Sequence, residues 1–488
     1  MSSLFYGLEI AKTGLNVSQQ GINLTGHNIA NANTVGYTRQ RIIQNSIDPS
    51  NTLGRISNVN KGTLGGGVAV TMIDQIRSDY LDRQYRHENA TLGNYTTKAE
   101  ELDYVETVMN ELSKNGLSAT MADFFNSLSE LSGDPVNDEI RTSVQQNAQK
   151  MIESFHHYYN QLTGLQSTYN ENMKVTVTDI NDLLTSIASY NEQITAFELS
   201  GEQANDLRDK RNLLLDDLSG LINIEYHINA DNELIVTCEG TELINHTTAT
   251  LLETHVNTTT GFYDIYYEGT TTDFDYSDGK LMAYKNLRDG NTSSNIGMPY
   301  IINNLNRLAR SLAEEFNAIH ETGYTKPIGA DASKTGVSFF EVPIGGYGNI
   351  TAGNLSLSAP VLANVRNIAA SGVAVTATNS GNNAIALVLA DLSSRTDMTD
   401  VGNFEEYLNS VVVELGIASS TAQTLSASQQ AIVDNLDSRK ESISGVSLDE
   451  EMVQMMTYQH AYSAASRVLS AMDEALEILI NRTGKVGL

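Results

Sequence analysis

The chain has 488 residues, with 59 acidic and 30 basic side chains and a formal net charge of −29. This length allows several domains with cores of their own, and the acidity argues against nucleic acid or an anionic lipid surface as a partner. A single cysteine, Cys238, excludes an intramolecular disulfide and a thiolate metal cluster, and its apolar neighbours predict a buried, unreactive thiol on a strand.

The amino-terminal segment, Ser2–Ala32, has the heptad spacing of a coiled coil. Two columns of this pattern would face a partner helix, and they consist of Leu4, Ala11, Ser18 and Thr25, and of Leu8, Leu15, Ile22 and Ile29. A third column directly beside them holds the close-packing residues Gly7, Gly14 and Gly21. Each glycine destabilises an isolated helix by about 1 kcal/mol relative to alanine, so this helix needs close neighbours. We expect it to be frayed in a free monomer and ordered when copies stack.

The same segment lacks the features of a cleavable secretion signal, because its apolar residues are spaced rather than contiguous. The charge-free run from Thr13 to Thr38 contains too many asparagine and glutamine residues for a transmembrane helix. If the protein is exported, its route therefore reads an uncleaved amino terminus, and we expect no membrane insertion.

A long helical region follows a short extended one. Clustered asparagines from Asn28 to Arg41 predict a shaped loop, and Gly65–Gly67 predicts a tight turn before a strand at Val68–Ile73. The helices predicted for an antiparallel bundle then cover 74–112, 118–131, 138–169, 175–199 and 204–218.

The hydrophobic period changes to two at Ile222 and predicts an inserted β region. Its strands are expected at 224–228, 234–238 and 263–267. Helix returns at Met298, a small mixed excursion follows at 325–391, and helix resumes from Asn403 to Ser442.

A second heptad seam begins after a capping box formed by Ser447 and Glu450. Its residues are Leu448, Met455, Tyr458, Tyr462, Ala465, Leu469, Met472, Leu476 and Leu479. Small residues flank this seam as well, so we predict that the two ends of the chain pack together and form the assembly interface.

The expected fold class is mainly α with an inserted β domain: the N- and C-terminal helices pair as a coiled coil beside a long helical bundle with outer β-rich insertions. The terminal domain is expected at 1–60 plus 442–488, the bundle at 61–222 plus 298–324 plus 392–441, the β domain at 223–297 and the small mixed insertion at 325–391.

No set of residues has the pattern of a catalytic, cofactor-binding or metal site. His156 and His157 are adjacent on a helix, unlike the i, i+4 pair of a helical zinc site, and we interpret them as solvated. His320 is interpreted as a helix-end residue that interacts with the dipole, and Asp206–Arg211 as a salt-bridged helix surface. We therefore predict no cofactor and no enzyme activity.

Several stretches resemble a known family. Ser3–Leu15 and Gly26–Gln40 resemble the amino-terminal signature of bacterial flagellar rod, hook and hook-associated proteins. Within that group, the segments that resemble the first hook-associated proteins are Gly36–Gln40, Met121–Leu128, Asp206–Arg211, Phe316–His320 and Ser442–Glu451. The similarity covers roughly residues 1–222, 298–320 and 400–488 and is weaker in the outer regions.

The resemblance implies a secreted structural protein of the extracellular flagellum, in a ring of copies that joins the hook to the filament. It implies export in an unfolded form by the flagellar type III apparatus, with a cytoplasmic chaperone at the C-terminal helix. Its neighbours would be other copies, the hook protein and the next junction protein.

Three alternatives stay open. The chain could be another axial component, namely a hook, distal rod or second junction protein, although the internal helical block favours the first junction protein. It could be an adhesin or enzyme displayed on a flagellar stalk, which a metal or hydrolytic activity in 223–289 would favour. A membrane-inserting type III translocator is a third class, and the lack of a long apolar run argues against it.

Overall fold

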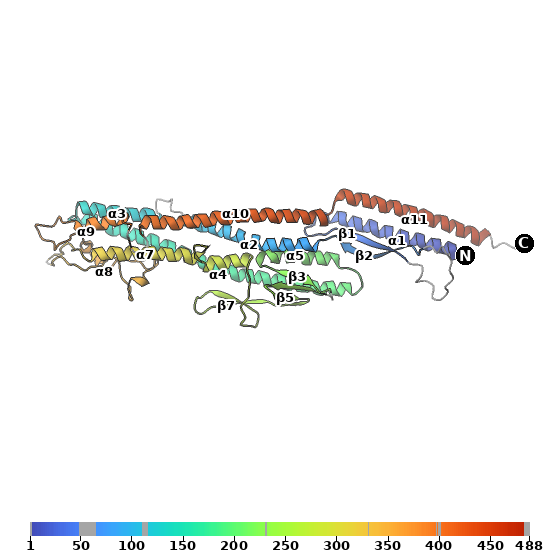
Figure 1. Ribbon diagram of the computed structural model, residues 1–488, viewed down its shortest axis with the longest axis horizontal. Helices are drawn as coiled ribbons and strands as arrows, with labels where there is room; N and C mark the ends of the chain where they lie inside the picture. Colours follow the sequence, from blue (N-terminus) through green and yellow to red (C-terminus); the bar gives the residue numbers. More distant parts are fainter. Residues whose placement is uncertain are drawn as a thin grey trace.

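The computed structural model is an elongated, mainly helical rod (Figure 1). It describes residues 2–47, 65–109, 116–229, 232–329, 331–396, 398 and 402–482, with side chains between residues 6 and 478 of these ranges. The first and last helices lie together at one end of the rod, and a group of short helices forms the other end (Figure 1). This architecture confirms the predicted fold class of terminal helix pair, long helical bundle and inserted β region.

One end of the rod is built from the two ends of the chain. Helix α1 (Ser2–Ala30) lies alongside α11 (Leu448–Arg482), and the antiparallel strands β1 (Gln40–Ser46) and β2 (Val68–Gln75) pack against α1. The strand predicted at Val68–Ile73 is therefore confirmed. It lies beside the terminal helices, although the expected division of the chain assigned it to the bundle.

The middle of the rod is a bundle of long helices. Its members are α2 (Asp79–Val108), α3 (Leu117–Gly133), α4 (Asp138–Glu198), α5 (Asn205–Leu221), α6 (Lys280–Asp289), α7 (Met298–His320) and α10 (Phe404–Ser444). Helix α10 packs along α2, while α3 and α5 pack along α4. Leucine, isoleucine, phenylalanine and tyrosine side chains at helical spacing fill the core between them. Within the described ranges, none of the helices has the length and apolar character needed to cross a bilayer.

Helix α4 corrects one prediction. The sequence predicted two helices, 138–169 and 175–199, but α4 is continuous for 61 residues. Asn170 and Met173, within the expected break, and Tyr169, directly before it, are buried against the rest of the bundle. No proline or glycine occurs between Tyr169 and Val175, and the burial of these residues stabilises the helix there.

The inserted β region lies along one side of the bundle (Figure 1). Strands β3 (Glu225–Ile228), β4 (Leu234–Cys238), β5 (Thr241–Asn245) and β6 (Thr248–Ala249) form one antiparallel sheet. Strands β7 (Leu252–Val256) and β8 (Tyr263–Tyr267) form a separate hairpin, and β9 (Asn291–Thr292) pairs with β10 (Asn295–Ile296) before α7. Three of these strands coincide with the predicted ones, and Cys238 is a buried residue of β4 as expected. Burial raises the pKa of its thiol to about 12, which keeps the thiol protonated and unreactive.

The other end of the rod consists of short helices and loops packed on α3, α4 and α7. The short helices are η2 (Tyr347–Asn349), α8 (Ala359–Ala363), η3 (Val365–Asn367), α9 (Ala384–Asp391) and η4 (Leu392–Ser394). Phe316, Phe339 and Phe340 form a closely packed aromatic group beneath them.

Two histidine interpretations were wrong. His320 does end α7, but it is fully buried, and burial lowers its pKa to about 4. It is therefore neutral and links two loops: its Nε2 accepts the Ala369 N–H at 2.8 Å, and its Nδ1–H donates to the Val337 carbonyl at 2.6 Å. His156 is half-buried rather than solvated, and its Nε2 lies 2.9 Å from the Leu355 carbonyl.

Candidate functional site

The face of α1 that meets α11 is made of small residues. Ala11, Ser18 and Thr25 are buried, and both hydroxyls donate to carbonyls of their own helix, so that no polar group is left unpaired there. A Cβ atom placed on Gly21 would lie 2.5 Å from Cδ1 of Tyr458. Glycine is therefore required at residue 21 for the two helices to approach this closely.

The three glycines of the predicted column differ in how tightly they are packed. A Cβ on Gly7 would lie 2.7 Å from the Met472 Cε, whereas a Cβ on Gly14 would lie 4.0 Å from the Ala465 Cβ, an ordinary contact. The glycine column thus faces α11 along its length, and side chains of α11 pack most tightly over Gly21 and Gly7.

The apolar column of α1 is less completely covered. Its described members are only half-buried, and they are Leu8, Leu15, Ile22 and Ile29. On α11 the predicted seam is half-buried at Met455, Tyr458, Tyr462, Ala465, Leu469, Met472 and Leu476. Leu448 is exposed, and the side chains of Leu4 and Leu479 lie outside the described residues.

The side of α11 that points away from α1 carries apolar side chains among charged ones such as Arg467 and Glu474. Its large exposed apolar side chains are Met452, Val453, Met456, Val468 and Ile478. The helix pair in one chain therefore covers one stripe of α11 and leaves other apolar surface in contact with solvent.

The loop after α1 is tied to the start of α11. The buried Asn28 side chain donates from Nδ2 to Glu451 Oε2 at 3.0 Å and to the Gln40 carbonyl at 2.9 Å. Arg39 donates from Nε to Glu451 Oε1 and from Nη1 to Glu450 Oε2, both at 2.7 Å. Glu451 is almost completely buried, so these charge-assisted bonds satisfy a carboxylate that water does not reach.

The same loop is also tied to α5 in the bundle. The Thr38 N–H donates to Asp209 Oδ2 at 2.9 Å, and Gln40 Nε2 donates to Asp206 Oδ1 at 2.9 Å. Gln75, at the end of β2, donates to Asp209 Oδ1 at 2.8 Å. Burial raises the pKa of Asp209 to about 6, although the Thr38 hydrogen bond and a nearby arginine favour its ionised form.

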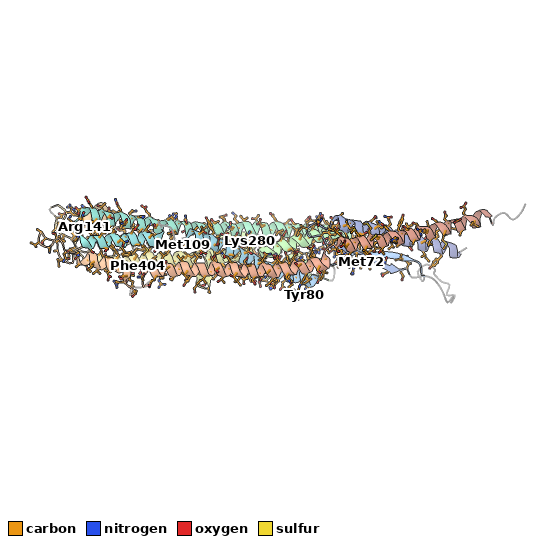
Figure 2. All side chains as sticks on the ribbon, turned by 90° about the horizontal axis from the view of Figure 1, so that it is seen from above. Met72, Tyr80, Met109, Arg141, Lys280 and Phe404 are labelled. Atoms are coloured by element: carbon orange, nitrogen blue, oxygen red, sulfur yellow. The ribbon has the colours of Figure 1, made fainter. Side chains whose placement is uncertain are left out.

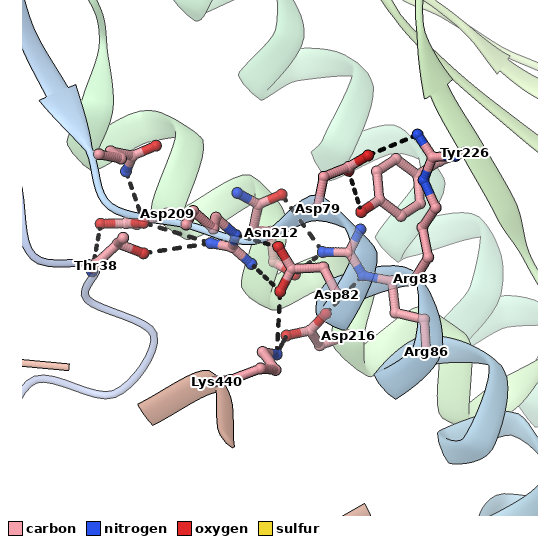
Figure 3. A network of polar contacts seen from close by, with 12 residues as sticks. Thr38, Asp79, Asp82, Arg83, Arg86, Asp209, Asn212, Asp216, Tyr226 and Lys440 are labelled. Atoms are coloured by element: carbon pink, nitrogen blue, oxygen red, sulfur yellow. Dashed lines mark hydrogen bonds and ion pairs between the residues drawn. The ribbon is translucent and has the colours of Figure 1, made fainter. Parts of the chain in front are cut away.

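A set of ion pairs continues these contacts into α2 and α10 (Figure 3). Arg77 Nε lies 2.5 Å from Asp82 Oδ2, and Arg86 Nε lies 2.6 Å from Asp216 Oδ1. Lys440 of α10 lies 3.1 Å from Asp216 and 3.6 Å from Asp82. Burial alone would raise the pKa of Asp216, but the positive charges of Arg86 and Lys440 outweigh it and hold that pKa below its usual value.

We call this set of contacts the joint network. It consists of Asn28, Thr38, Arg39, Gln40, Gln75, Arg77, Asp82, Arg86, Asp206, Asp209, Asp216, Lys440, Glu450 and Glu451. The network connects the terminal helix pair to α2, α5 and α10, and it lies where α10 ends and α11 begins (Figures 1 and 3). It can therefore fix the direction in which the helix pair leaves the bundle.

The joint network corrects the interpretation of Asp206–Arg211 as a salt-bridged surface of a helix. Asp209 and Arg211 are buried, and Arg211 Nη1 donates to Asn191 Oδ1 of α4 at 2.9 Å. Sequence reasoning assigned no role to Arg77, Asp82, Arg86, Asp216 and Lys440. Three segments that carried the family resemblance meet in this network, and they are 36–40, 206–211 and 442–451. Their shared resemblance was the one feature of the sequence that could have indicated the network.

The charged groups of the network are paired with one another. Its carboxylates contact arginine, lysine and amide groups. Among the described residues, no group of at least 3 His, Cys, Asp or Glu side chains could hold a metal ion.

Relatives of this chain are known. A protein of Bacillus subtilis (strain 168) named flagellar hook-associated protein 1 is 31% identical over 519 residues, an alignment that covers 100% of both chains. This chain belongs to the flagellar hook-associated protein 1 family. A family member from Escherichia coli (strain K12) is 24% identical over 567 residues, with 99% of this chain and 100% of that protein aligned.

Family models and a solved structure agree with this membership. The model described as the flagellar hook-associated protein FlgK helical domain matches residues 102–340. Models of the flagella basal body rod protein and of the flagellar basal body rod FlgEFG protein C-terminal region match 8–38 and 441–482. The flagellar hook junction protein FlgK from Burkholderia pseudomallei has the same fold, with a TM-score of 0.58 and 15% identity over 75% of this chain and 100% of that one.

Membership in the flagellar hook-associated protein 1 family identifies the chain as a structural, axial component of the bacterial flagellum. The matches to rod-protein models coincide with α1 and α11, and the match to the helical-domain model begins in α2 and ends beyond α7. The terminal pair is thus the part that resembles other axial proteins, and the helical bundle is the part that resembles this family.

Proposed function

We propose that copies of this chain form a ring that joins the flagellar hook to the filament, and that the copies assemble through α1 and α11. The observation that carries the proposal is the incomplete cover of the helix pair. Leu8, Leu15 and Ile22 remain half-buried on α1, and Met452 and Val453 remain exposed on α11. Neighbouring copies, the hook protein and the next junction protein are the partners that would bury this surface.

The joint network supports the proposal because an adapter must hold its assembly helices at a defined angle to its outer part. The network ties the loop after α1 to both the bundle and α11 through Arg39, Glu451 and Asp209. Removing one partner of a buried charged pair destabilises a protein by about 3–5 kcal/mol, so such a network resists rotation of the helix pair.

Export belongs to the same proposal. In a single chain α11 exposes apolar residues and those of α1 are only half-buried, and such surface would aggregate in the cytoplasm before assembly. A cytoplasmic chaperone that binds the C-terminal helix, and passage through the flagellar type III apparatus in an unfolded form, would avoid this outcome and deliver the chain to the extracellular flagellum.

The test is a pair of charge substitutions on the exposed face of α11, Met452→Glu and Val453→Glu. Both side chains are about half exposed in the single chain, so we expect the folded bundle and its melting temperature to be unchanged. We expect the double variant to be absent from purified flagella and to leave cells without attached filaments, because stacked copies would bury the new charges.

The matched control is Val175→Glu on α4, whose side chain is exposed to a similar degree in the bundle. It should enter flagella at the wild-type level. Normal incorporation of the α11 double variant, measured by immunoblot of purified flagella, would refute assembly through this face.

A further inference from the structure

The outer face of α10 is uncharged over the middle of the helix, in a chain with a net charge of −29. No acidic or basic residue occurs between Glu414 and Asp434. Large apolar side chains are exposed on this face, and they are Val413, Ile417, Leu425 and Ile432. The other exposed residues between them are uncharged, and most are small or hydroxylated: Ser420, Thr421, Gln423, Thr424, Ala427, Ser428, Gln430 and Ala431.

This face is not the one that holds α10 in the bundle. Helix α10 packs on α2 and α7 through its opposite side, where Leu408, Leu415 and Val433 are buried. In Figure 1, α10 runs along one edge of the rod, and among the described elements it packs mainly on α2 and α7. With a rise of about 1.5 Å per residue, the uncharged stretch from Leu415 to Val433 is about 27 Å long.

The exposed side of α4 differs from this face. The exposed side of α4 carries Glu171, Lys174, Asp179 and Asp182. Polar and charged residues on a solvent face are the ordinary pattern of an amphipathic helix, so the composition of α10 needs its own explanation.

We propose that the outer face of α10 is a lateral contact surface for a second copy of this chain. This inference rests on the proposed ring, and it names the part of the bundle by which neighbouring copies touch. Two identical chains with a strong negative charge repel each other. A close contact between them therefore costs least free energy at an uncharged surface, because no charged side chain has to be buried there. Small residues such as Ser420 and Thr424 would let a neighbouring helix approach to about 8–10 Å between axes.

The position of the face supports the choice of occupant. Helix α10 is followed by α11 after Gly445–Ser447, and both run along the same side of the rod (Figure 1). The α10 face therefore continues toward the exposed α11 residues Met452 and Val453, which the assembly proposal assigns to contacts between copies. A ring contact is heterologous, so the neighbour would present a different surface to α10.

The first experiment maps the partner without assuming which surface it presents. A photo-activated benzoylphenylalanine is placed at Thr421 in the full chain, and at Asp179 on α4 as the control, in cells that lack their own copy. Irradiation of assembled flagella should give a product of twice the chain mass from the Thr421 variant. A product that contains a different protein, or the absence of any product in assembled flagella, would overturn the proposal.

The second experiment introduces repulsion. Ile417→Glu with Leu425→Glu places acidic charges on exposed sites, so the melting temperature of the purified chain should stay at the wild-type value. We expect at least tenfold less of this variant than of Val175→Glu in purified flagella. Wild-type incorporation of the α10 variant would refute the lateral contact. The proposed assembly through α1 and α11 would still stand if the Met452→Glu, Val453→Glu variant were absent from flagella. It would fail if that variant also assembled.

Discussion

Asp209 is a buried carboxylate whose native environment favours its protonated form. Burial raises its pKa from 3.8 to about 6, against the opposing effects of Thr38 and Arg77, while Asp206 adds to the rise. A group with a raised native pKa contributes stability that is fully present below its unfolded pKa and is lost as the pH rises through its native pKa. Asp209 therefore contributes less to stability at pH 7.5 than at pH 4.

The prediction at this scale concerns Asp209→Asn. The amide keeps an oxygen that can accept the Thr38 N–H, but it removes the titration. From about pH 4 to pH 7.5, the wild type should lose about 2–3 kcal/mol of its free energy of unfolding relative to the variant, because only the wild type has the titrating carboxyl. Urea unfolding at both pH values checks this, and parallel pH dependences of the two proteins would show that Asp209 titrates normally.

At the scale of elements, the contact between α1 and α11 leaves room for an added methyl group at some glycines of α1 and not at others. Gly14→Ala places its Cβ at ordinary distance from Ala465, and its higher helix propensity should stabilise α1 by about 1 kcal/mol. Gly21→Ala has the same gain in propensity, but its Cβ meets the Tyr458 ring, and the displaced ring should destabilise the pair by about 1–3 kcal/mol.

The two alanine variants are each other's control. Incorporation into flagella should be unchanged or improved for Gly14→Ala and reduced for Gly21→Ala. Equal behaviour of the two variants would mean that the helices do not approach as closely in the assembly as they do in one chain.

The elements that could be predicted from the sequence are those with a regular period. The heptad seam of α11 appears in the structure as a half-buried stripe from Met455 to Leu476, and the strands β3, β4 and β8 coincide with alternating runs. The break predicted within α4 was wrong. A short interruption of the apolar spacing does not end a helix whose residues there, such as Asn170 and Met173, are buried against the bundle. The burial of Asp209 could not be predicted, since its partners Thr38 and Gln75 are remote in sequence. The i, i+3 and i, i+4 spacing of charges in Asp206–Arg211 is the same for a buried helix face as for a solvated one, so it does not reveal burial.

On the scale of the whole molecule, the rod has regions that differ in how completely they are buried. The bundle has a continuous apolar core that extends into the inserted β region, and Figure 2 shows side chains along its whole length from Arg141 near one end to Tyr80 near the joint. In the terminal pair, beyond Met72, the two helices contact each other along a single stripe. This stripe consists of small residues on α1 and half-buried residues on α11. The joint network stabilises the near end of this pair, and neighbouring copies would stabilise the rest.

Hydrogen exchange on the purified monomer and on assembled flagella tests this account most directly. In the monomer, amides of α2, α4 and α10 should be strongly protected, those near Asn28 and Glu451 intermediate, and those near Gly7 and Met472 unprotected. Assembly should then protect the ends of α1 and α11 by at least a hundredfold. Ends that are as protected in the free monomer as in the flagellum would contradict the claim that neighbouring copies complete the helix pair.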